Sequence, residues 1–406
     1  MQQTITIKVR IKPESKSDMQ ALESSMERYR QGCNEVSRYI FDHDFEMSQT
    51  ELNRLLYQQL RTRYHLKSQM AQSVIRTVAA SYRTLRTQMK KHPYRYSLKT
   101  ETGYTRCSVP RDLYWLWEPV SFKRPQLDLQ RNRDWSISKD GTLSINTIHG
   151  RIHVPFVCRG FDKYMDGTWQ FGIAKILCRK NKWYMYISAS KDLPDIAKEQ
   201  IKHVVGIDRG LRFLATTYDE QGRTMFFDGR QAIRKRRKFK RLRQQLQSRN
   251  TKSAKRRLKK IGQRENRYMT DINHCLSKTL ADRFGPDTLF VLEDLKDIRS
   301  ATEKVAKDQR YEQVSWAFFQ LEQFLTYKAR LAGSEVIHVS AEYTSQRCPK
   351  CGRIRKANRD HHKHLYTCDH CGYASNDDRI GAMNIWQLGM DYINGDEHPA
   401  FIKQSL

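Results

Sequence analysis

The chain opens with an alternation of apolar and polar residues that is typical of a half-buried β-strand. Segment 4–12 places its apolar residues at every second position, and these are Ile5, Ile7, Val9 and Ile11. From about Ser17 the apolar spacing becomes helical. It predicts one helix that extends to about Ile40, a second that begins at Ser48, and a third over about 67–90.

The predicted helices show apolar stripes and a start signal. Ser48 followed by Glu51 is a capping-box pattern, in which the serine side chain accepts a hydrogen bond from the first turn of the helix. The apolar stripe of this second helix consists of Leu52, Leu55, Leu56 and Leu60. His92-Pro93 ends the helical lobe.

From Pro93 to about Asp192 the pattern is one of short strands and turns. Turn signals occur at 140–142 and 149–150, and a hairpin is predicted from Trp169 to Ile187. This region therefore resembles a small β-barrel or sandwich. We expect strand 4–12 to belong to it, with the helical lobe inserted.

A third region begins near Ile201, with strands predicted at 203–208, 212–218, 224–228, 288–295 and 335–340. Helices separate the later strands: two basic helices broken near 248–251, one through His274, and one over about 311–332 that ends at Gly333. Residues 296–309 are polar and are expected to form a loop. The order predicts an α/β fold of the RNase H-like type, in a multidomain chain.

Carboxylates occur where two of these strands end. Asp208 closes the apolar run of VVGIDRG, Glu293 closes that of TLFVLEDL, and Asp378 lies at the start of NDDRIGAMNI. Mg²⁺ prefers oxygen ligands, and two such ions about 3.5–4 Å apart suit phosphodiester chemistry. We therefore expect Asp208, Glu293 and Asp378 to bind Mg²⁺ and to be catalytic.

The charge of the chain points to a polyanionic partner. The 406 residues carry a formal net charge of +30, and only 38% of them are hydrophobic. Such a surface favours nucleic acid. No apolar run is long enough for a membrane span, and the N-terminal alternation does not resemble a signal peptide.

Nine cysteines are present, and four of them form two C-x-x-C pairs. The motif CPKC at 348–351 and the motif CDHC at 368–371 have the spacing of a zinc ribbon. The expected ligands of this structural Zn²⁺ are Cys348, Cys351, Cys368 and Cys371, and His370 is not expected to be one. The other cysteines are scattered, which indicates a reduced, cytoplasmic protein. If its partner is DNA, we expect it to associate with the nucleoid when bound.

Candidate nucleic-acid contacts come from two places. On the third helix they are Gln69, Gln72 and Arg76. Between 234 and 260 there is no acidic residue, and the candidates there are Arg236, Arg237, Lys240, Arg241, Arg256, Arg257 and Lys260. Aromatic residues between 114 and 183 could stack on bases, but the core of a β domain is the more common use of such residues.

At this point the chain resembles the TnpB family of transposon-associated RNA-guided nucleases, which is related to the compact type V CRISPR effectors. The motifs that carry the resemblance are VVGIDRG, VLEDL, VSWAFFQLEQFLTYKARLAG, TSQRCPKCG, YTCDHCGY and NDDRIGAMNI. The resemblance is specific from about 201 to 388 and weaker before it. Arg209 and Arg347 depart from the common family pattern, but neither is expected to touch the acids.

The resemblance implies a division into domains. A wedge domain would comprise 1–14 and 94–200, with a helical recognition lobe at 15–93 inserted in it. A RuvC-like nuclease domain would comprise 201–345 and its last helix at 376–390, with the zinc ribbon at 346–375 and a tail at 391–406. The three acids and four cysteines match the family's catalytic and zinc residues.

The resemblance also implies RNA-guided DNA cleavage. The partners would be a guide RNA and double-stranded DNA that carries a short flanking motif, and no membrane. A transposase of the same fold is a second interpretation, and an RNA-guided repressor that does not cut is a third. Oligomeric state, the flanking motif and the source of the guide remain open.

Overall fold

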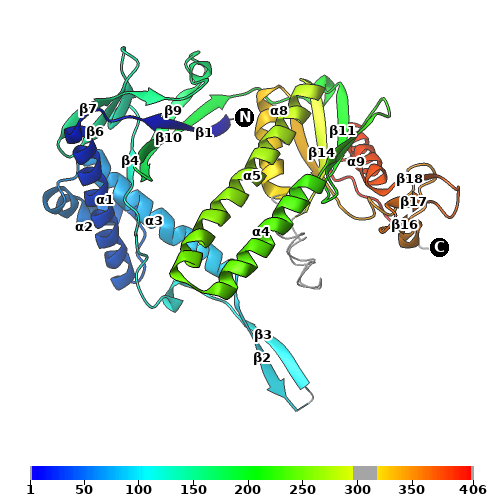
Figure 1. The fold of residues 1–406 in the computed structure, drawn as a ribbon, viewed down its shortest axis with the longest axis horizontal. Helices are drawn as coiled ribbons and strands as arrows, with labels where there is room; N and C mark the ends of the chain where they lie inside the picture. The colour runs from blue at the N-terminus through cyan, green and yellow to red at the C-terminus, as the bar shows by residue number, and fades with distance from the viewer. Residues whose placement is uncertain (1, 102, 296–317, 404–406) are drawn as a thin grey trace. The chain divides into compact units, whose positions relative to one another are not determined.

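The computed structural model describes residues 2–101, 103–295 and 318–403, and within them the chain forms two compact units, Gln2–Asp192 and Leu193–Leu406. Figure 1 shows the elements of each unit. The predicted loop at 296–309 and the first part of the predicted helix at 311–332 lie outside the described residues. No helix in the described ranges is both long and apolar enough to cross a bilayer.

The unit Gln2–Asp192 begins with strand β1 (Gln2–Ile11) and three helices, α1 (Lys16–Asp42), α2 (Gln49–Arg63) and α3 (Ser68–Lys91). These elements confirm the predicted strand and helical lobe. The Ser48 side chain caps α2 by accepting a hydrogen bond from the Glu51 backbone N–H. Leu55, however, is 44% exposed, so its assignment to the apolar stripe was wrong. Leu52, Leu56 and Leu60 already form the buried i, i+4, i+8 row, and Leu55 lies beside it.

The remaining elements of this unit are short strands. They are β2 (Tyr94–Thr100), β3 (Gly103–Val109), β4 (Leu127–Leu129), β5 (Trp135–Ile137), β6 (Leu143–Thr147), β7 (Gly150–Val154), β8 (Phe156–Val157), β9 (Gln170–Arg179) and β10 (Lys182–Asp192). The main sheet has the order β4-β9-β10-β1-β8, so β1 belongs to the β-rich region as predicted. Strands β1 and β10 are antiparallel, with Ile7 opposite Ile187. The helices and the sheet share one hydrophobic core.

The unit Leu193–Leu406 is built on a sheet with the order β13-β12-β11-β14-β15. Its strands are β11 (His203–Asp208), β12 (Phe213–Asp219), β13 (Thr224–Asp228), β14 (Thr288–Glu293) and β15 (Glu335–Val339). β11, β12 and β13 are antiparallel, whereas β11, β14 and β15 are parallel. The five predicted strands are all present and follow in the predicted order along the chain.

Helices pack on this sheet and extend from it. They are α4 (Arg230–Arg249), α5 (Lys252–Phe284), α8 (Phe318–Leu331) and α9 (Asp377–Ile393). The break between the two basic helices lies at Asn250, which has a left-handed backbone conformation. The prediction of a separate helix through His274 was wrong, because α5 continues without interruption to Phe284. The ribbon strands β16 (Arg359–Asp360), β17 (Leu365–Thr367) and β18 (Ala374–Asn376) precede α9.

Candidate carboxylate and metal sites

Two of the predicted acids end neighbouring strands. β11 and β14 are parallel, with Ile207 opposite Leu292. Asp208 and Glu293 each follow that pair by one residue, so both carboxylates arrive at the same edge of the sheet. The residues that precede each acid on β11 and β14 are mostly apolar and buried. Their burial fixes the direction in which the Asp208 and Glu293 side chains leave the strands.

Helix α9 brings the third acid to this edge. Asn376 caps the helix by accepting hydrogen bonds from the backbone N–H groups of Asp378 and Arg379, at 3.1 and 3.2 Å. The helix packs closely on β11, because a Cβ atom at Gly206 would lie only 2.3 Å from the backbone oxygen of Ala382. A Cβ atom at Gly381 would lie 2.8 Å from Oδ2 of Asp208, so this glycine makes room for the carboxylate.

The acids influence one another's protonation. Burial raises the pKa of Asp208 well above its usual value, and the charges of Glu293 and Asp378 raise it further. Burial also raises the pKa of Glu293 and that of Asp378. Negative charges that are buried together in this way are stabilised by a cation.

Glu293 is held by groups that lie far from it in the sequence. Thr344 donates a 2.5 Å hydrogen bond to its carboxylate. Arg209 donates a 2.6 Å hydrogen bond to its backbone oxygen and forms a 2.8 Å ion pair with Glu322, which also contacts His338 at 3.1 Å. Arg209 was not expected to touch the acids, but it does contact Glu293, through the backbone oxygen and not through the carboxylate.

A second group of potential ligands surrounds Asp378. Single ligand atoms of His364, Asp377 and Asp378 all lie within 4.8 Å of one another. Arg359 forms a 3.0 Å ion pair with Asp377, and its Nη2 lies 3.8 Å from Oδ1 of Asp378. No sequence pattern marks Arg359 as a neighbour of Asp378, because its position depends on how the ribbon folds.

The residues at this edge fit a divalent cation. Oδ2 of Asp378 is buried and has no hydrogen-bond partner among the described residues. Buried carboxylate oxygens without a partner are costly unless a cation compensates them. The donor set consists of carboxylate oxygens, which are hard ligands of the kind that Mg²⁺ prefers.

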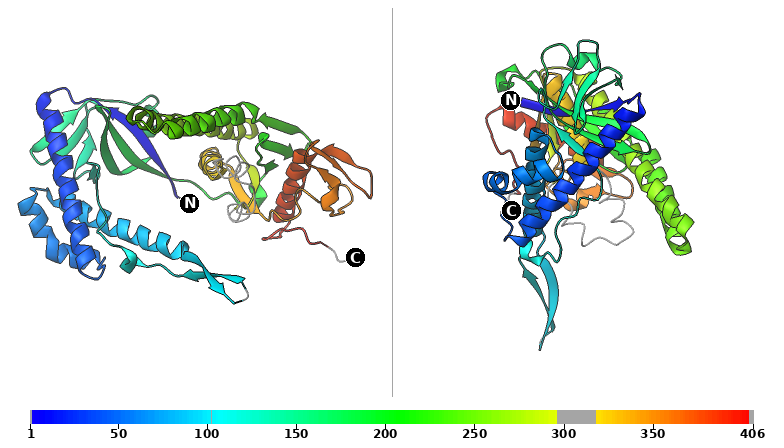
Figure 2. Two further views of the ribbon diagram at one scale, coloured as in Figure 1. Left: turned by 60° about the horizontal axis from the view of Figure 1, so that its bottom comes forward. Right: turned by 90° about the vertical axis from the view of Figure 1, so that its left-hand side faces the viewer.

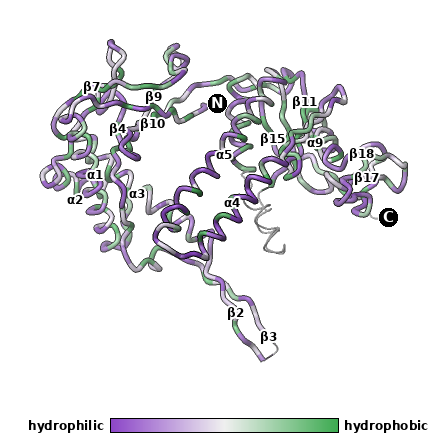
Figure 3. Tube along the Cα trace, in the orientation of Figure 1, coloured by the Kyte–Doolittle hydropathy of each residue, from purple (hydrophilic) through white to green (hydrophobic). Residues whose placement is uncertain are grey.

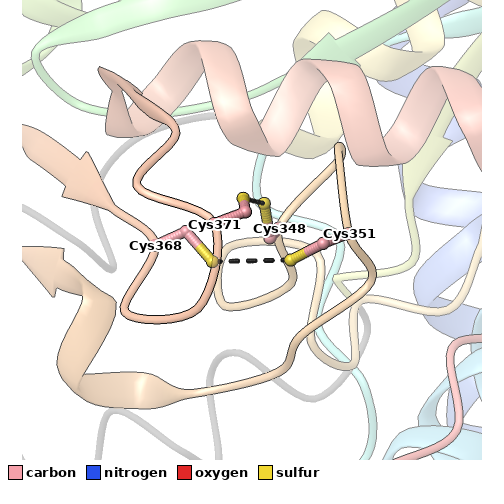
Figure 4. Close-up of side chains that lie close together, drawn as sticks. All are labelled: Cys348, Cys351, Cys368 and Cys371. Atoms are coloured by element: carbon pink, nitrogen blue, oxygen red, sulfur yellow. Dashed lines mark hydrogen bonds between the residues drawn. The ribbon is translucent and has the colours of Figure 1, made fainter.

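The four predicted zinc ligands lie together (Figure 4). Sγ atoms of Cys348 and Cys371 are 3.6 Å apart, and those of Cys351 and Cys368 are 3.5 Å apart. A tetrahedral Zn²⁺ with Zn–S bonds of about 2.3 Å requires sulfur separations of about 3.8 Å. The cluster therefore fits a structural zinc, and His370 is not part of it.

Both knuckles of the ribbon have the same geometry. Gly352 and Gly372 have φ values of +75° and +71°, which favour glycine. Burial alone would raise the pKa of Cys368, but the backbone N–H groups of Cys371 and His370 lower it to about 7. Burial raises the pKa of Cys348 to about 12 and also raises the pKa of Cys351, so a lowered pKa is not shared by the cluster. The fit to zinc rests on the sulfur geometry.

The ribbon is connected to α9 by packing and hydrogen bonds. Ile380 of α9 is buried with Tyr366 and two of the cysteines. The Asn384 side chain donates hydrogen bonds to the backbone oxygens of Thr344 and Arg347, at 2.7 and 2.8 Å. Folding of the ribbon therefore helps to fix the position of Asp378, as expected from its place seven residues after Cys371.

The candidate contacts on α3 differ in exposure. Gln72 and Arg76 are exposed, whereas Gln69 is half-buried. Arg76 lines a hollow of about 510 Å³ together with Gln88 and Lys175. Their role in nucleic-acid binding stays a prediction.

The basic helices α4 and α5 lie side by side and are hydrophilic along much of their length (Figures 2 and 3). Among the candidates on them, Lys240 is half-buried, and five are exposed, namely Arg237, Arg241, Arg256, Arg257 and Lys260. Arg236 is only 2% exposed, so its assignment as a surface contact was wrong. It lies one helical turn after the buried Ala232, on the face that packs inward.

The aromatic residues between 114 and 183 divide into two groups. Trp183 is buried in the core, but Tyr114, Trp115 and Trp117 are exposed, and Trp117 is 98% exposed. Trp115 lies 5.8 Å from Tyr94 of β2 between ring centroids. The β-domain core therefore accounts for only some of these side chains.

Two family models match ranges that lie almost entirely in the unit Leu193–Leu406. Residues 188–310 match the family OrfB_IS605, described as "Probable transposase". Residues 318–385 match the family described as "Cas12f1-like, TNB domain". These matches cover both β11 and α9, which carry candidate carboxylates.

Individual proteins are similar to larger parts of the chain. The CRISPR-associated endodeoxyribonuclease Cas12f1 of Sulfoacidibacillus thermotolerans is 28% identical over 265 residues, which is 60% of each chain. The TnpB-like protein MJ0751 of Methanocaldococcus jannaschii is 30% identical over 135 residues, or 33% of this chain and 48% of that protein. The chain thus spans between about half and three fifths of these relatives.

The fold is also found in a solved structure. The protein in the cryo-EM structure of a Cas12f1–sgRNA–target DNA complex superimposes with a TM-score of 0.56 and 14% identity, over 91% of this chain and 82% of that one. At this identity the likeness concerns the fold alone. The chain is therefore similar in sequence to TnpB-like and Cas12f1 proteins, and its multidomain α/β fold is similar to that of a Cas12 effector.

Proposed function

We propose that the chain is an RNA-guided DNA endonuclease with a RuvC-type active site formed by Asp208, Glu293 and Asp378. The observation that carries this proposal is the convergence of the three acids from β11, β14 and α9, with the pKa of each carboxyl raised by burial. The strand order β13-β12-β11-β14-β15 supports an RNase H-like assignment.

The three carboxylates would hold Mg²⁺. When bound, a pair of these ions would activate water and stabilise the leaving 3′ oxygen. The chain's own residues would hold the ligands in place: Thr344 and Arg209 orient Glu293, and Gly381 leaves room for Asp208. Arg359 adds a fixed positive charge beside Asp378.

The proposed substrate is DNA that a bound RNA selects by base pairing. Support comes from the name of one relative, an endodeoxyribonuclease, and from the fold shared with a protein solved with sgRNA and target DNA. The net charge of +30 suits the binding of both nucleic acids. We assign the exposed cations of α4 and α5 to contacts with phosphates.

We further propose the division into domains given above. The unit Gln2–Asp192 would contain the wedge domain and, at 15–93, the recognition lobe inserted after β1. The other unit would contain the nuclease domain, with the zinc ribbon inserted before its last helix. In this arrangement the zinc is structural, since four thiolates would fill a tetrahedral shell.

A cleavage assay tests the proposal. The chain would be purified with its co-expressed RNA and given a matching DNA duplex in Mg²⁺ or in EDTA. We expect Mg²⁺-dependent cuts that end in a free 3′ hydroxyl, and none with Asp208→Ala, Glu293→Ala or Asp378→Ala. Cutting that survives all three substitutions would refute the assignment of the acids.

A transposase is the second candidate, because residues 188–310 match a family described as "Probable transposase". The same assay separates the two when its products are also screened for joined strands, since a transposase joins the 3′ end that it has freed to another strand, whereas a nuclease leaves cut ends only. An RNA-guided repressor would bind the target without cutting it. The presence of all three acids argues against that function.

A further inference from the structure

The β2–β3 hairpin stands apart from the rest of its unit. Its strands pair only with each other, and it runs on from the end of α3 (Figures 1 and 2). Within its two strands, only Thr100 and Cys107 are half-buried, and the other residues are exposed. A lone two-stranded hairpin is at best marginally stable in water, so a bound partner would stabilise it.

The register gives the hairpin two different faces. On one face Tyr94 lies opposite Val109, and Tyr96 lies opposite Cys107. On this face the Tyr94 ring lies 6.0 Å from the Tyr96 ring of the same strand. It also lies 5.8 Å from the ring of Trp115, which is outside the hairpin. Among the described residues, this face has a ring neighbour outside the hairpin only at Tyr94, and Leu98 further along it is 51% exposed. The other face differs from it in chemistry.

The opposite face is basic, and we call it the basic hairpin face; it consists of Arg95, Lys99, Tyr104 and Arg106. Lys99 lies directly opposite Tyr104, and Arg106 is two residues further along the same strand. Tyr104 is 75% exposed. No carboxylate of the described ranges lies within ion-pair distance of the three cations.

An exposed ring between cations suits an unpaired nucleotide. Bases stack on aromatic side chains regardless of sequence, while neighbouring Lys and Arg contact the phosphates. A second copy of the chain is less suitable, because a symmetric contact would place the same three cations against one another. A double helix is also less suitable, because its bases are stacked inside.

We propose that the basic hairpin face binds an unpaired segment of the RNA that the protein carries, with one base stacked on Tyr104. This inference rests on the proposed function, which supplies the RNA. The RNA presents unpaired loops and ends whenever the protein carries it, whereas a strand of the target DNA is unpaired only after the RNA has displaced it. The hairpin thereby adds an RNA contact in the unit that does not contain the carboxylates.

The test uses the full chain and a fluorescent 20-nucleotide oligouridine that carries one photoreactive 4-thiouridine. Tyr104→Ala should weaken binding about ten-fold, because a stacked base contributes about 1–3 kcal/mol. Tyr104→Phe keeps the ring and should bind like wild type. Lys99→Gln with Arg106→Gln should reduce the slope of log K against log salt by about 1.4, or about 0.7 for each phosphate that is no longer neutralised.

Leu98→Ala is the matched control, because Leu98 is exposed on the opposite face of the same hairpin. It should bind like wild type, and photo-cross-links in wild type should map to 94–109. Unchanged affinity and salt slope in the Tyr104→Ala and Lys99→Gln/Arg106→Gln proteins would overturn the proposal. A second result would also overturn it. If Leu98→Ala changes the mass measured by light scattering while Tyr104→Ala binds RNA like wild type, the hairpin contacts a second copy of the chain and not RNA.

Failure of the proposed function gives a different result. If wild type binds oligouridine but never cuts a target matched to its RNA, the endonuclease proposal fails, and the effect of Tyr104→Ala is still measurable. If wild type cuts the target and Tyr104→Ala changes neither binding nor cross-links, the hairpin proposal alone fails.

Discussion

The position of Asp208 depends on a glycine in another element. A Cβ atom at Gly381 would lie 2.8 Å from Oδ2 and 3.0 Å from Cγ of Asp208. Because the aspartate side chain is short, Gly381→Ala should push the carboxylate from its place or shift α9. We expect DNA cleavage to fall at least ten-fold, measured under single-turnover conditions in Mg²⁺.

Gly262 offers the matched control for this substitution. It lies in α5, and a Cβ atom there would meet nothing within 4 Å. Gly262→Ala should keep full activity and raise the free energy of unfolding by up to about 1 kcal/mol, because alanine favours a helix. Equal activity of the two variants would contradict the proposed packing around Asp208.

Glu322 links Arg209 to His338 and should make stability depend on pH. Burial alone would raise the pKa of Glu322, but hydrogen bonds from His338 and Arg209 lower it to about 2. A carboxyl with a lowered folded pKa stabilises the fold above its unfolded pKa of about 4.3, and this contribution is lost as pH falls toward 2. Glu322→Gln should therefore be less stable than wild type at pH 7.

The difference in unfolding free energy between Glu322→Gln and wild type should shrink as pH falls from about 4.5 to 2. Urea unfolding at several pH values measures it. A difference that stays constant over this range would show that the ionised carboxylate does not contribute to stability.

At the residue scale the sequence indicated the candidate acids but not the residues that hold them in position. Asp208 and Glu293 were recognisable because each ends an apolar strand pattern, which is a local signal. Thr344 and Arg209 reach Glu293 only after β14, β15 and α8 have packed, so no local pattern marks them. Arg236 was misassigned because a run of cations conceals which of them lie on the inward face of a helix.

Among the elements, the ribbon and α9 should act as one structure. Cys368→Ser should reduce bound zinc and lower cleavage, because the ribbon carries the polypeptide that enters α9 and holds Asp378. Metal analysis and the cleavage assay measure the two effects. Cys178→Ser is the control, since Cys178 is exposed and outside the ribbon.

Loss of zinc without loss of cleavage would show that Asp378 is fixed independently of the ribbon. Loss of cleavage in the Cys178→Ser protein would show that the effect is not specific to the metal ligands.

Helices α4 and α5 should contribute to binding through exposed cations alone. Arg256→Gln with Arg257→Gln should lower the salt slope of duplex DNA binding by up to about 1.8, or about 0.9 for each phosphate that is no longer neutralised. The unfolding curve of this double variant should match that of wild type, because both side chains are exposed.

Arg236→Gln should have the opposite effects. Its stability should be lower and its salt slope unchanged, because Arg236 is buried.

The elements were largely predictable from periodicity. Strand β1, the helical lobe and the mixed sheet follow patterns of period 2 or 3.6 that residues carry locally. The continuity of α5 was not predictable, because its pattern changes from basic to amphipathic near Gly262, and glycine disfavours the interior of a helix. The isolation of the β2–β3 hairpin depends on which strands remain unpaired, and local alternation does not show that.

Taken together, the two units combine a carboxylate site with a strongly basic chain. The carboxylates and the zinc ribbon lie in Leu193–Leu406, while the helical lobe, the main β sheet and the basic hairpin face lie in Gln2–Asp192. A nuclease that needed only the unit Leu193–Leu406 would not require the unit Gln2–Asp192. Guidance by RNA would give that unit a role, because an RNA must be held while its pairing segment remains free.

Redirected cleavage is the most direct test of this central claim. The RNA that co-purifies with the protein would be sequenced, its variable segment replaced, and the complex offered two duplexes in Mg²⁺, one matching the old segment and one the new. We predict that the cut moves to the new duplex and disappears with Asp208→Ala. Cutting that ignores the RNA sequence, or the absence of any defined RNA, would contradict RNA guidance.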